Sequence, residues 1–218
     1  MNPRNSITVA IALAAALIIP SASDAGIFRD VLSSVGIGQK DPPKDANGIP
    51  SFPRMGFACC DLHYNKSGIN DYNYSELPMI PAGTPVEVIR YGRHSADLKV
   101  DGKAVTLDQD YGRDQESLDV FVKKLIINDD PRPRIASYPV TVQEAIRQGK
   151  VMVGMTREQC IVAIGYPIIT ENLTLDAPSW TLYHASGEAY RLYFGPDGHL
   201  QKISADGDLA KVAYSPGS

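Results

Sequence analysis

A short helix with a defined start and a defined end constrains the fold of this chain more than any other feature of its sequence. In the stretch VGMTREQCIVAIGYP, at residues 153–167, Thr156 and Gln159 have the spacing of a capping box, which satisfies free backbone N–H groups at a helix start. Gly165 suits the left-handed position after a helix, and Pro167 cannot continue one. Because so short a helix is marginal alone in water, it must pack against other elements.

Three alternating runs downstream provide a surface for that packing. SWTLYHA, EAYRLYF and GPDGHLQKIS alternate apolar and polar residues with the period of two that half-buried strands show. A second short helix is predicted at TVQEAIRQG, where Thr141 and Glu144 have capping-box spacing and Gly149 is the stop. Residues 138–206 therefore predict an α+β fold of order α-α-β-β-β, an antiparallel meander with helices on one face.

Residues 56–130 predict a small, barrel-like antiparallel β domain that ends in a helix. Asp101-Gly102 lies between two alternating runs and is a strong signal for a two-residue hairpin, because Gly tolerates the positive φ of a type I′ turn. Asp114 is the expected N-cap of a helix whose apolar residues recur at helical spacing over 118–125. The run IPAGTPVEVIRYGRHSADLKVDGKAVTL resembles a bacterial Src-homology-3-like barrel.

Residues 1–25 have the organisation of a secretory signal peptide. An arginine precedes an uncharged core at residues 7–19, and Ser23 and Ala25 are small residues at the −3 and −1 positions of a cleavage site. The core is too short to span a hydrocarbon layer of about 30 Å. We therefore expect a periplasmic or secreted mature protein, and no lipoprotein anchor because no Cys lies near the cleavage site. Residues 26–55 are predicted to be a linker.

Composition limits the function classes. The 218 residues are 44% hydrophobic and 21% charged, as in globular proteins, and a net charge of −4 gives no basic surface for nucleic acid. P-loop, G-x-S-x-G and H-E-x-x-H motifs do not occur in the sequence, and no Cys/His spacing suits zinc. We therefore predict that the protein is not an enzyme and uses no cofactor or metal.

The three cysteines leave alternatives open. An oxidising compartment permits one disulfide, and the adjacent Cys59 and Cys60 would close a strained ring, so Cys60 with Cys160 is the predicted pairing. The alternative is that Cys160 is a small buried hydrophobic residue. Cys60 with His63 is also a candidate for a cysteine hydrolase, in which Asp61 orients the base.

Three tyrosines in DLHYNKSGINDYNY are the candidate interaction surface. Tyr64, Tyr72 and Tyr74 each combine apolar area with a polar tip, a combination enriched at protein interfaces. The competing interpretation is that they pack loops against the β domain.

The C-terminal region is similar to the BamE family, also called the SmpA/OmlA domain. The likeness is carried by residues at matching positions, which are Gly154, Met155, Thr156, Gly165, Pro167, Trp180, Phe194 and Gly198. The chain departs from the family in that Tyr183 stands three residues after Trp180 instead of two, and in that about 100 residues precede the matching region without a lipobox Cys.

The resemblance implies a small non-catalytic subunit of the outer-membrane β-barrel assembly machinery, which stabilises partner lipoproteins and touches lipid. Because of these departures, we expect an exported protein that reuses the fold to bind another protein of the cell envelope, with outer-membrane lipid or peptidoglycan as further contacts. An alternative hypothesis is that the β domain binds peptidoglycan or another cell-wall ligand.

Overall fold

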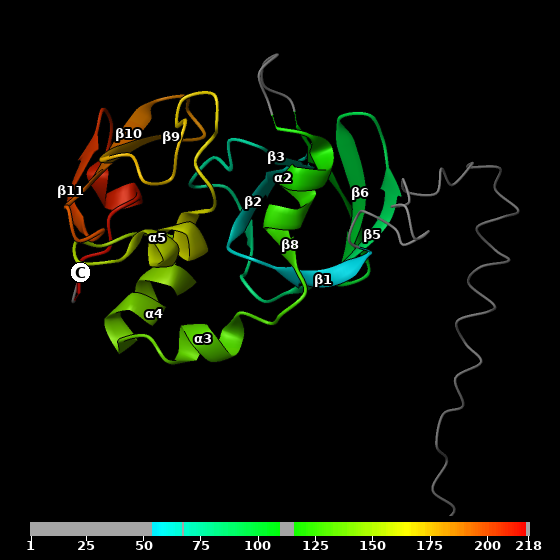
Figure 1. Cartoon of the computed structure of the whole chain (residues 1–218), viewed down its shortest axis with the longest axis horizontal. Coiled ribbons are helices and arrows are strands. Elements are labelled where there is room, and N and C mark those ends of the chain that lie inside the picture. Colours follow the sequence, from blue (N-terminus) through cyan, green and yellow to red (C-terminus); the bar gives the residue numbers. More distant parts are fainter. Residues whose placement is uncertain (1–53, 67, 110–115, 217–218) are drawn as a thin grey trace, which may run out of the picture. The chain divides into compact units, whose positions relative to one another are not determined.

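The computed structural model describes residues 54–66, 68–109 and 116–216. The predicted signal peptide, nearly all of the predicted linker and Asp114 therefore lie outside the described residues. The described helices and strands form a mixed α+β fold (Figure 1). Within these residues, no helix has the length and apolar character needed to span a membrane.

Eight of the described strands form a first sheet, in the order β4-β2-β3-β7-β6-β5-β1-β8. Their bounds are Met55–Ala58 for β1, Leu62–Asn65 for β2, Gly68–Asn70 for β3, Met79–Ile80 for β4, Pro85–Tyr91 for β5, Ser95–Val100 for β6, Lys103–Asp108 for β7 and Ile126–Ile127 for β8. The sheet is open and curled, and β3 pairs with β7 in parallel. The prediction of a barrel-like antiparallel domain is corrected at this pair of strands, because the chain reverses between β2 and β3 before it meets β7.

The predicted hairpin is confirmed at the turn between β6 and β7. Val100 pairs with Lys103, and Asp101 and Gly102 have φ values of 48° and 78°. Positive φ at both central residues is the requirement of a type I′ turn. This turn fixes the register of the two strands, so that alternate residues of β6 face the interior.

The helix between β7 and β8, α2, spans Leu118–Leu125. Its four apolar residues at helical spacing are buried, as predicted, while its start differs from the expected one. Ser117 is the N-cap residue and makes no side-chain cap hydrogen bond. The helix therefore gains its stability from the apolar face that it buries, since propensity alone rarely holds two turns together.

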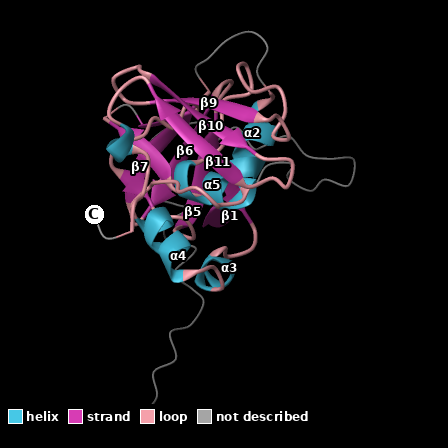
Figure 2. Cartoon of the chain, turned by 90° about the vertical axis from the view of Figure 1, so that its left-hand side faces the viewer, coloured by secondary structure: helices cyan, strands magenta, loops and turns pink. Residues whose placement is uncertain are grey.

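The C-terminal region contains three α-helices, a three-stranded sheet and a 3₁₀ turn. Their bounds are Arg132–Ala136 for α3, Val140–Arg147 for α4, Arg157–Ile164 for α5, Ser179–Tyr183 for β9, Ala189–Phe194 for β10, Leu200–Ala205 for β11 and Leu209–Lys211 for η1. The strands pair antiparallel in the order β11-β10-β9, which confirms the predicted meander. Figure 2 shows α5 beside this sheet, with α4 next to α5.

The ends of α5 follow from its sequence. Thr156 Oγ1 accepts from Gln159 N at 3.2 Å, and Gln159 Oε1 accepts from Thr156 N at 2.9 Å, which confirms the capping box. Gly165 ends the helix with φ 79° and ψ −178°, so its φ is positive as predicted but its ψ is extended. The second predicted capping box is absent. The N-cap of α4 is Pro139 instead of Thr141, and Pro139 O accepts the first helical hydrogen bonds.

Two hydrophobic clusters organise the described residues. The first core runs from Ala58 to Ile126 and joins the first sheet to α2, and the second core runs from Val142 to Val212 and joins α4 and α5 to the meander. Ile164, Trp180 and Leu192 are buried in the second core. Both clusters lie within the same compact unit of the chain, so the division into two domains stays a prediction.

Candidate functional site

A short segment between β1 and β2 contacts elements of both cores. Cys59 N donates to Leu125 O of α2 at 2.9 Å, and Asp61 N donates to Val162 O of α5 at 2.9 Å. Backbone groups this deeply buried are costly to leave unpaired. These two bonds therefore tie the first sheet to α2 and to α5 within three residues of chain.

The side chain of Asn73 adds three hydrogen bonds at the same junction. Its Nδ2 donates to Asp61 O at 3.0 Å and to Ile164 O at 2.7 Å, and its Oδ1 accepts from His63 N at 2.6 Å. Asn73 is buried and has a φ of 45°, a conformation that Asn tolerates better than most residues. One amide therefore holds β2 against the C-terminal end of α5.

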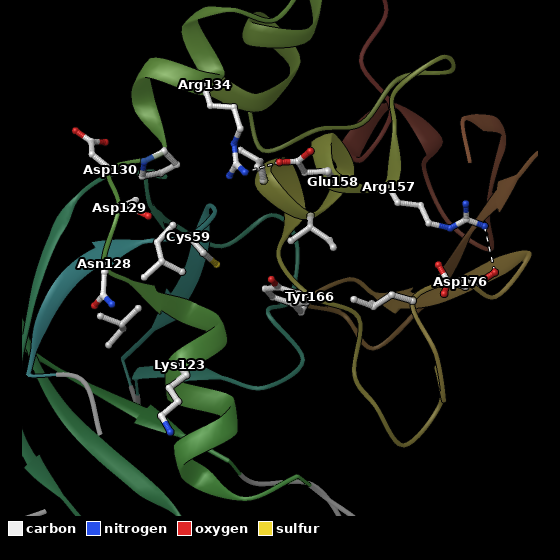
Figure 3. Close-up of a pocket in the computed structure, with 16 residues that line it drawn as sticks. Cys59, Lys123, Asn128, Asp129, Asp130, Arg134, Arg157, Glu158, Tyr166 and Asp176 are labelled. Carbon is white, nitrogen blue, oxygen red and sulfur yellow. Dashed lines mark hydrogen bonds and ion pairs between the residues drawn. The ribbon is translucent and has the colours of Figure 1, made fainter. Parts of the chain in front are cut away.

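A cleft of about 1010 Å³ opens beside this junction (Figure 3). We call it the α2–α5 cleft; its lining comes from α2, β8, α3, α5, the segment between β1 and β2, and the loops that follow β8 and α5. In Figure 3, Cys59 and Tyr166 lie between Lys123 at one end and the Arg134–Glu158 pair at the other. Segments about 100 residues apart in the sequence therefore build one surface.

The charged side chains of the α2–α5 cleft carry both signs. Arg134 Nη1 lies 2.5 Å from Glu158 Oε1, a pair that joins α3 to α5. Arg157 Nη2 donates to Ala177 O at 3.0 Å, and its guanidinium lies over the ring of Phe194 at 4.5 Å. Its Nε is buried without a hydrogen-bond partner among the described residues. Such a mixed surface can bind a polypeptide segment through apolar contacts and charge pairs together.

The structure separates the three candidate tyrosines. Tyr72 and Tyr74 stack with ring centroids 5.1 Å apart, and Tyr183 of β9 meets Tyr72 edge-on at 5.2 Å. Tyr64 instead packs against the first core and lines another cleft. None of the predicted three lines the α2–α5 cleft. Sequence reasoning missed Tyr183 as a partner of this cluster, although its outward place in the alternating run was visible.

The structure corrects the predicted pairing of Cys60 with Cys160. It joins Cys59 to Cys60 and leaves Cys160 as a buried free thiol. Cys60 belongs to the first core and Cys160 to the second, which places the two side chains in different clusters. Burial raises the pKa of the Cys160 thiol to about 12, in agreement with the alternative that this residue is a small buried hydrophobic one.

The hydrolase candidates do not assemble into a catalytic arrangement. Cys60 is bonded to Cys59 and has no exposed surface, so it offers no thiolate. Asp61 Oδ1 accepts from Ala82 N at 2.8 Å, and the backbone N–H of His63 donates to Asn73. The Cys60 hydrolase hypothesis therefore lacks its nucleophile in this structure.

Burial shifts the pKa values of Asp61 and His63 in opposite directions. Asp61 is 2% exposed, and desolvation raises its pKa to about 7, against a smaller lowering by the hydrogen bond from Ala82 N. His63 is 4% exposed, and desolvation lowers its pKa to about 4. Both shifts disfavour the charged form, as expected for groups removed from water.

Metal ligands do not gather in the described part of the chain. Over residues 54–66, 68–109 and 116–216, no three or more His, Cys, Asp and Glu side chains are placed to hold a metal ion together.

Comparisons of the chain with protein-family models, curated proteins and solved structures find no match. The fold defines the chain as a mixed α+β protein.

Proposed function

We propose that this chain is an exported, non-enzymatic protein of the cell envelope that acts as a protein-interaction or scaffold module. The observation that carries the proposal is the α2–α5 cleft of about 1010 Å³. Small-molecule sites occupy about 300–1000 Å³ and enclose most of the ligand. A cleft at the top of that range, open and lined by charges of both signs, suits a segment of another polypeptide better.

The lining of the cleft offers two kinds of contact to such a segment. Ile127 and Ile161 are half-buried, and Leu175 is exposed, so aliphatic side chains of a partner can bury apolar area here. The Arg134–Glu158 pair lies at the rim, where exposed charges contribute little affinity and mainly set orientation and association rate. The partner that fits is therefore a segment with apolar anchors and charged flanks.

The resemblance of residues 138–206 to the BamE family gives the partner class. The order α4, α5, β9, β10, β11 is the order that this resemblance implies, which supports reuse of that fold. Export is proposed from the signal-peptide pattern of residues 1–25. The proposed partner is another envelope protein, with outer-membrane lipid as a further contact.

Site-specific crosslinking in the native envelope tests this proposal. A photoreactive amino acid replaces Asp129, an exposed residue of the cleft lining, and the control replaces Arg93, an exposed residue in the turn between β5 and β6. We expect a discrete heavier species from the Asp129 variant after irradiation and none from the Arg93 variant. Monomer alone from both variants, or the same adduct from both, would contradict the proposal.

A second candidate function is the binding of a cell-wall ligand. A cleft of about 340 Å³ lies beside the β6–β7 hairpin, lined in part by Tyr64, Lys66, Lys103 and Thr106. A tyrosine face with polar neighbours suits a saccharide or a short peptide. Co-sedimentation with purified peptidoglycan tests this function, with Tyr64→Ala expected to reduce binding, and an absence of enrichment of the unmutated protein removes it.

A further inference from the structure

A cleft of about 380 Å³ is lined by the turn after β4 and by helices α3 and α4. We call it the Asp61 cleft, because Asp61 is its most deeply buried acidic residue. Most of its lining is aliphatic and includes Pro81, Ala82, Ile135 and Ile146. A carboxylate among aliphatic side chains is an arrangement that costs free energy unless the charge is paired.

Asp61 is held rigidly and yet lacks one partner. Its backbone N–H donates to Val162 O, its carbonyl accepts from Asn73 Nδ2, and its Oδ1 accepts from Ala82 N at 2.8 Å. Its Oδ2 is buried and has no hydrogen-bond partner among the described residues. The surrounding bonds therefore fix the position of an acceptor that the described residues leave unsatisfied.

The two arginines of this cleft are already paired. Arg132 Nε donates to Asp130 Oδ2 at 2.8 Å, and Arg147 Nε donates to Glu144 Oε2 at 3.0 Å. Within the described residues, neither guanidinium forms an ion pair with Asp61. The rim is therefore electrically balanced, while the interior holds an acid without a counter-charge.

We propose that the Asp61 cleft binds a primary alkylammonium group, which donates to Asp61 Oδ2 while its methylene stem packs against Pro81, Ile135 and Ile146. Long cationic side chains bury their stems along apolar surface in this way. A guanidinium fits less well, because it prefers both oxygens of a carboxylate and Ala82 N already occupies Oδ1. The alkylammonium comes from a free diamine or from a lysine side chain of a partner.

Titration of the whole exported protein with defined amines tests the proposal. The probes are cadaverine for the free diamine and Nα-acetyl-lysine amide, whose side-chain amine is free, for the lysine side chain. Pentanol and Nα-acetyl-arginine amide are the comparators. The titrations are run at about pH 8, above the pKa of about 7 of Asp61. The readouts are calorimetric affinity and the NMR shift of the Ala82 amide, whose N–H donates to Asp61.

We expect one or both amines to bind and to shift the Ala82 amide. The variant Asp61→Asn keeps the shape of the side chain and is expected to weaken amine binding at least tenfold. The matched control Asp97→Asn, an acid of β6 that pairs with Arg90 outside this cleft, is expected to leave the affinity unchanged. Binding of cadaverine alone identifies a free diamine, and binding of the lysine probe alone identifies a partner side chain.

Three results would overturn the proposal. They are no shift of the Ala82 amide with either amine, equal binding of pentanol and cadaverine, and tighter binding of the arginine probe than of the lysine probe. The NMR comparison uses the unmutated protein, so it decides the question even where Asp61→Asn fails to fold. The result is independent of the crosslinking experiment, because Asp129 lines the α2–α5 cleft and not the Asp61 cleft.

Discussion

At the scale of single residues, Asp61 and His63 make opposite contributions to stability as pH changes. The folded-state pKa of Asp61 is raised from 3.8 to about 7, so its contribution is fully present below pH 3.8 and is lost as pH rises toward 7. The folded-state pKa of His63 is lowered from 6.5 to about 4, so its contribution is fully present above pH 6.5 and is lost as pH falls toward 4. Between about pH 4 and 6.5 the two slopes oppose each other.

Single variants are expected to expose each slope. Asp61→Asn removes the pH dependence that Asp61 contributes and keeps that of His63. The free energy of unfolding of this variant, relative to the unmutated protein, should therefore rise with pH between about pH 4 and 6.5. His63→Gln keeps only the pH dependence of Asp61, so its free energy of unfolding relative to the unmutated protein should fall with pH over the same range. Each slope is at most about 1.4 kcal/mol per pH unit. Urea unfolding at several pH values measures these slopes. If the free energy of unfolding depends on pH in the same way for the unmutated protein and both variants, the two side chains stay solvated in the folded state.

At the scale of secondary-structure elements, the end of α5 depends on a glycine for two reasons. Gly165 has a positive φ of 79°, and a Cβ at this position would lie 2.2 Å from Asn73 Nδ2. Gly165→Ala is therefore expected to destabilise the protein by about 3 kcal/mol or more, from backbone strain together with displacement of the Asn73 amide. Chemical denaturation measures the loss.

Gly187 is the matched control for this substitution. Its φ is 88°, and a Cβ there would meet nothing within 4 Å. Gly187→Ala should therefore cost only the backbone term of about 1–2 kcal/mol. Equal losses at the two positions would show that the contact between Gly165 and Asn73 does not limit the end of α5.

Elements defined by neighbouring residues could be predicted from the sequence. The capping box of α5, the Asp101-Gly102 turn and the three-stranded meander depend on residue types a few positions apart, and the structure contains them. The sequence pattern places the N-cap of α4 two residues late, at Thr141 instead of Pro139, because the carbonyl of Pro139 accepts the first helical hydrogen bonds without help from Thr141. Local patterns identify an element more reliably than its first residue.

Features that depend on distant residues could not be predicted. Two examples are the parallel pairing of β3 with β7 and the hydrogen bond from Asn73 to Ile164. In both cases, the local sequence pattern of one segment does not indicate the other as its partner. Proximity in the sequence grouped Tyr64 with Tyr72, while the fold brings Tyr72 to Tyr183. The α2–α5 cleft has the same origin, because its lining forms only when the fold brings residues of α2 and α5 to one surface.

At the scale of the whole molecule, one short segment connects the two cores. Asp61 bonds to α5 through its backbone, and Asn73 bonds to Asp61, His63 and Ile164. Because these groups are buried, separating the cores would expose or orphan each of them at about 1–3 kcal/mol per group. The unmutated protein is therefore expected to unfold in one transition, in which both cores lose structure together.

Asn73→Ala is expected to uncouple the two cores. The variant loses three buried hydrogen bonds and about 2–4 kcal/mol of stability. Fluorescence of Trp180, the single tryptophan, reports the second core, and hydrogen exchange of β5 to β7 reports the first. In this variant we expect the two probes to give separate denaturation midpoints.

Asn172→Ala is the matched control for the uncoupling, because Asn172 is also a buried residue whose side chain makes three hydrogen bonds, none of which reaches the first core. Its Nδ2 donates to Ile168 O and Thr181 O, and its Oδ1 accepts from Thr181 N. Its loss should lower stability while both probes still report one midpoint, since the junction is intact. Coincident midpoints in Asn73→Ala would instead mean that apolar packing between the cores is enough to make them unfold as one unit.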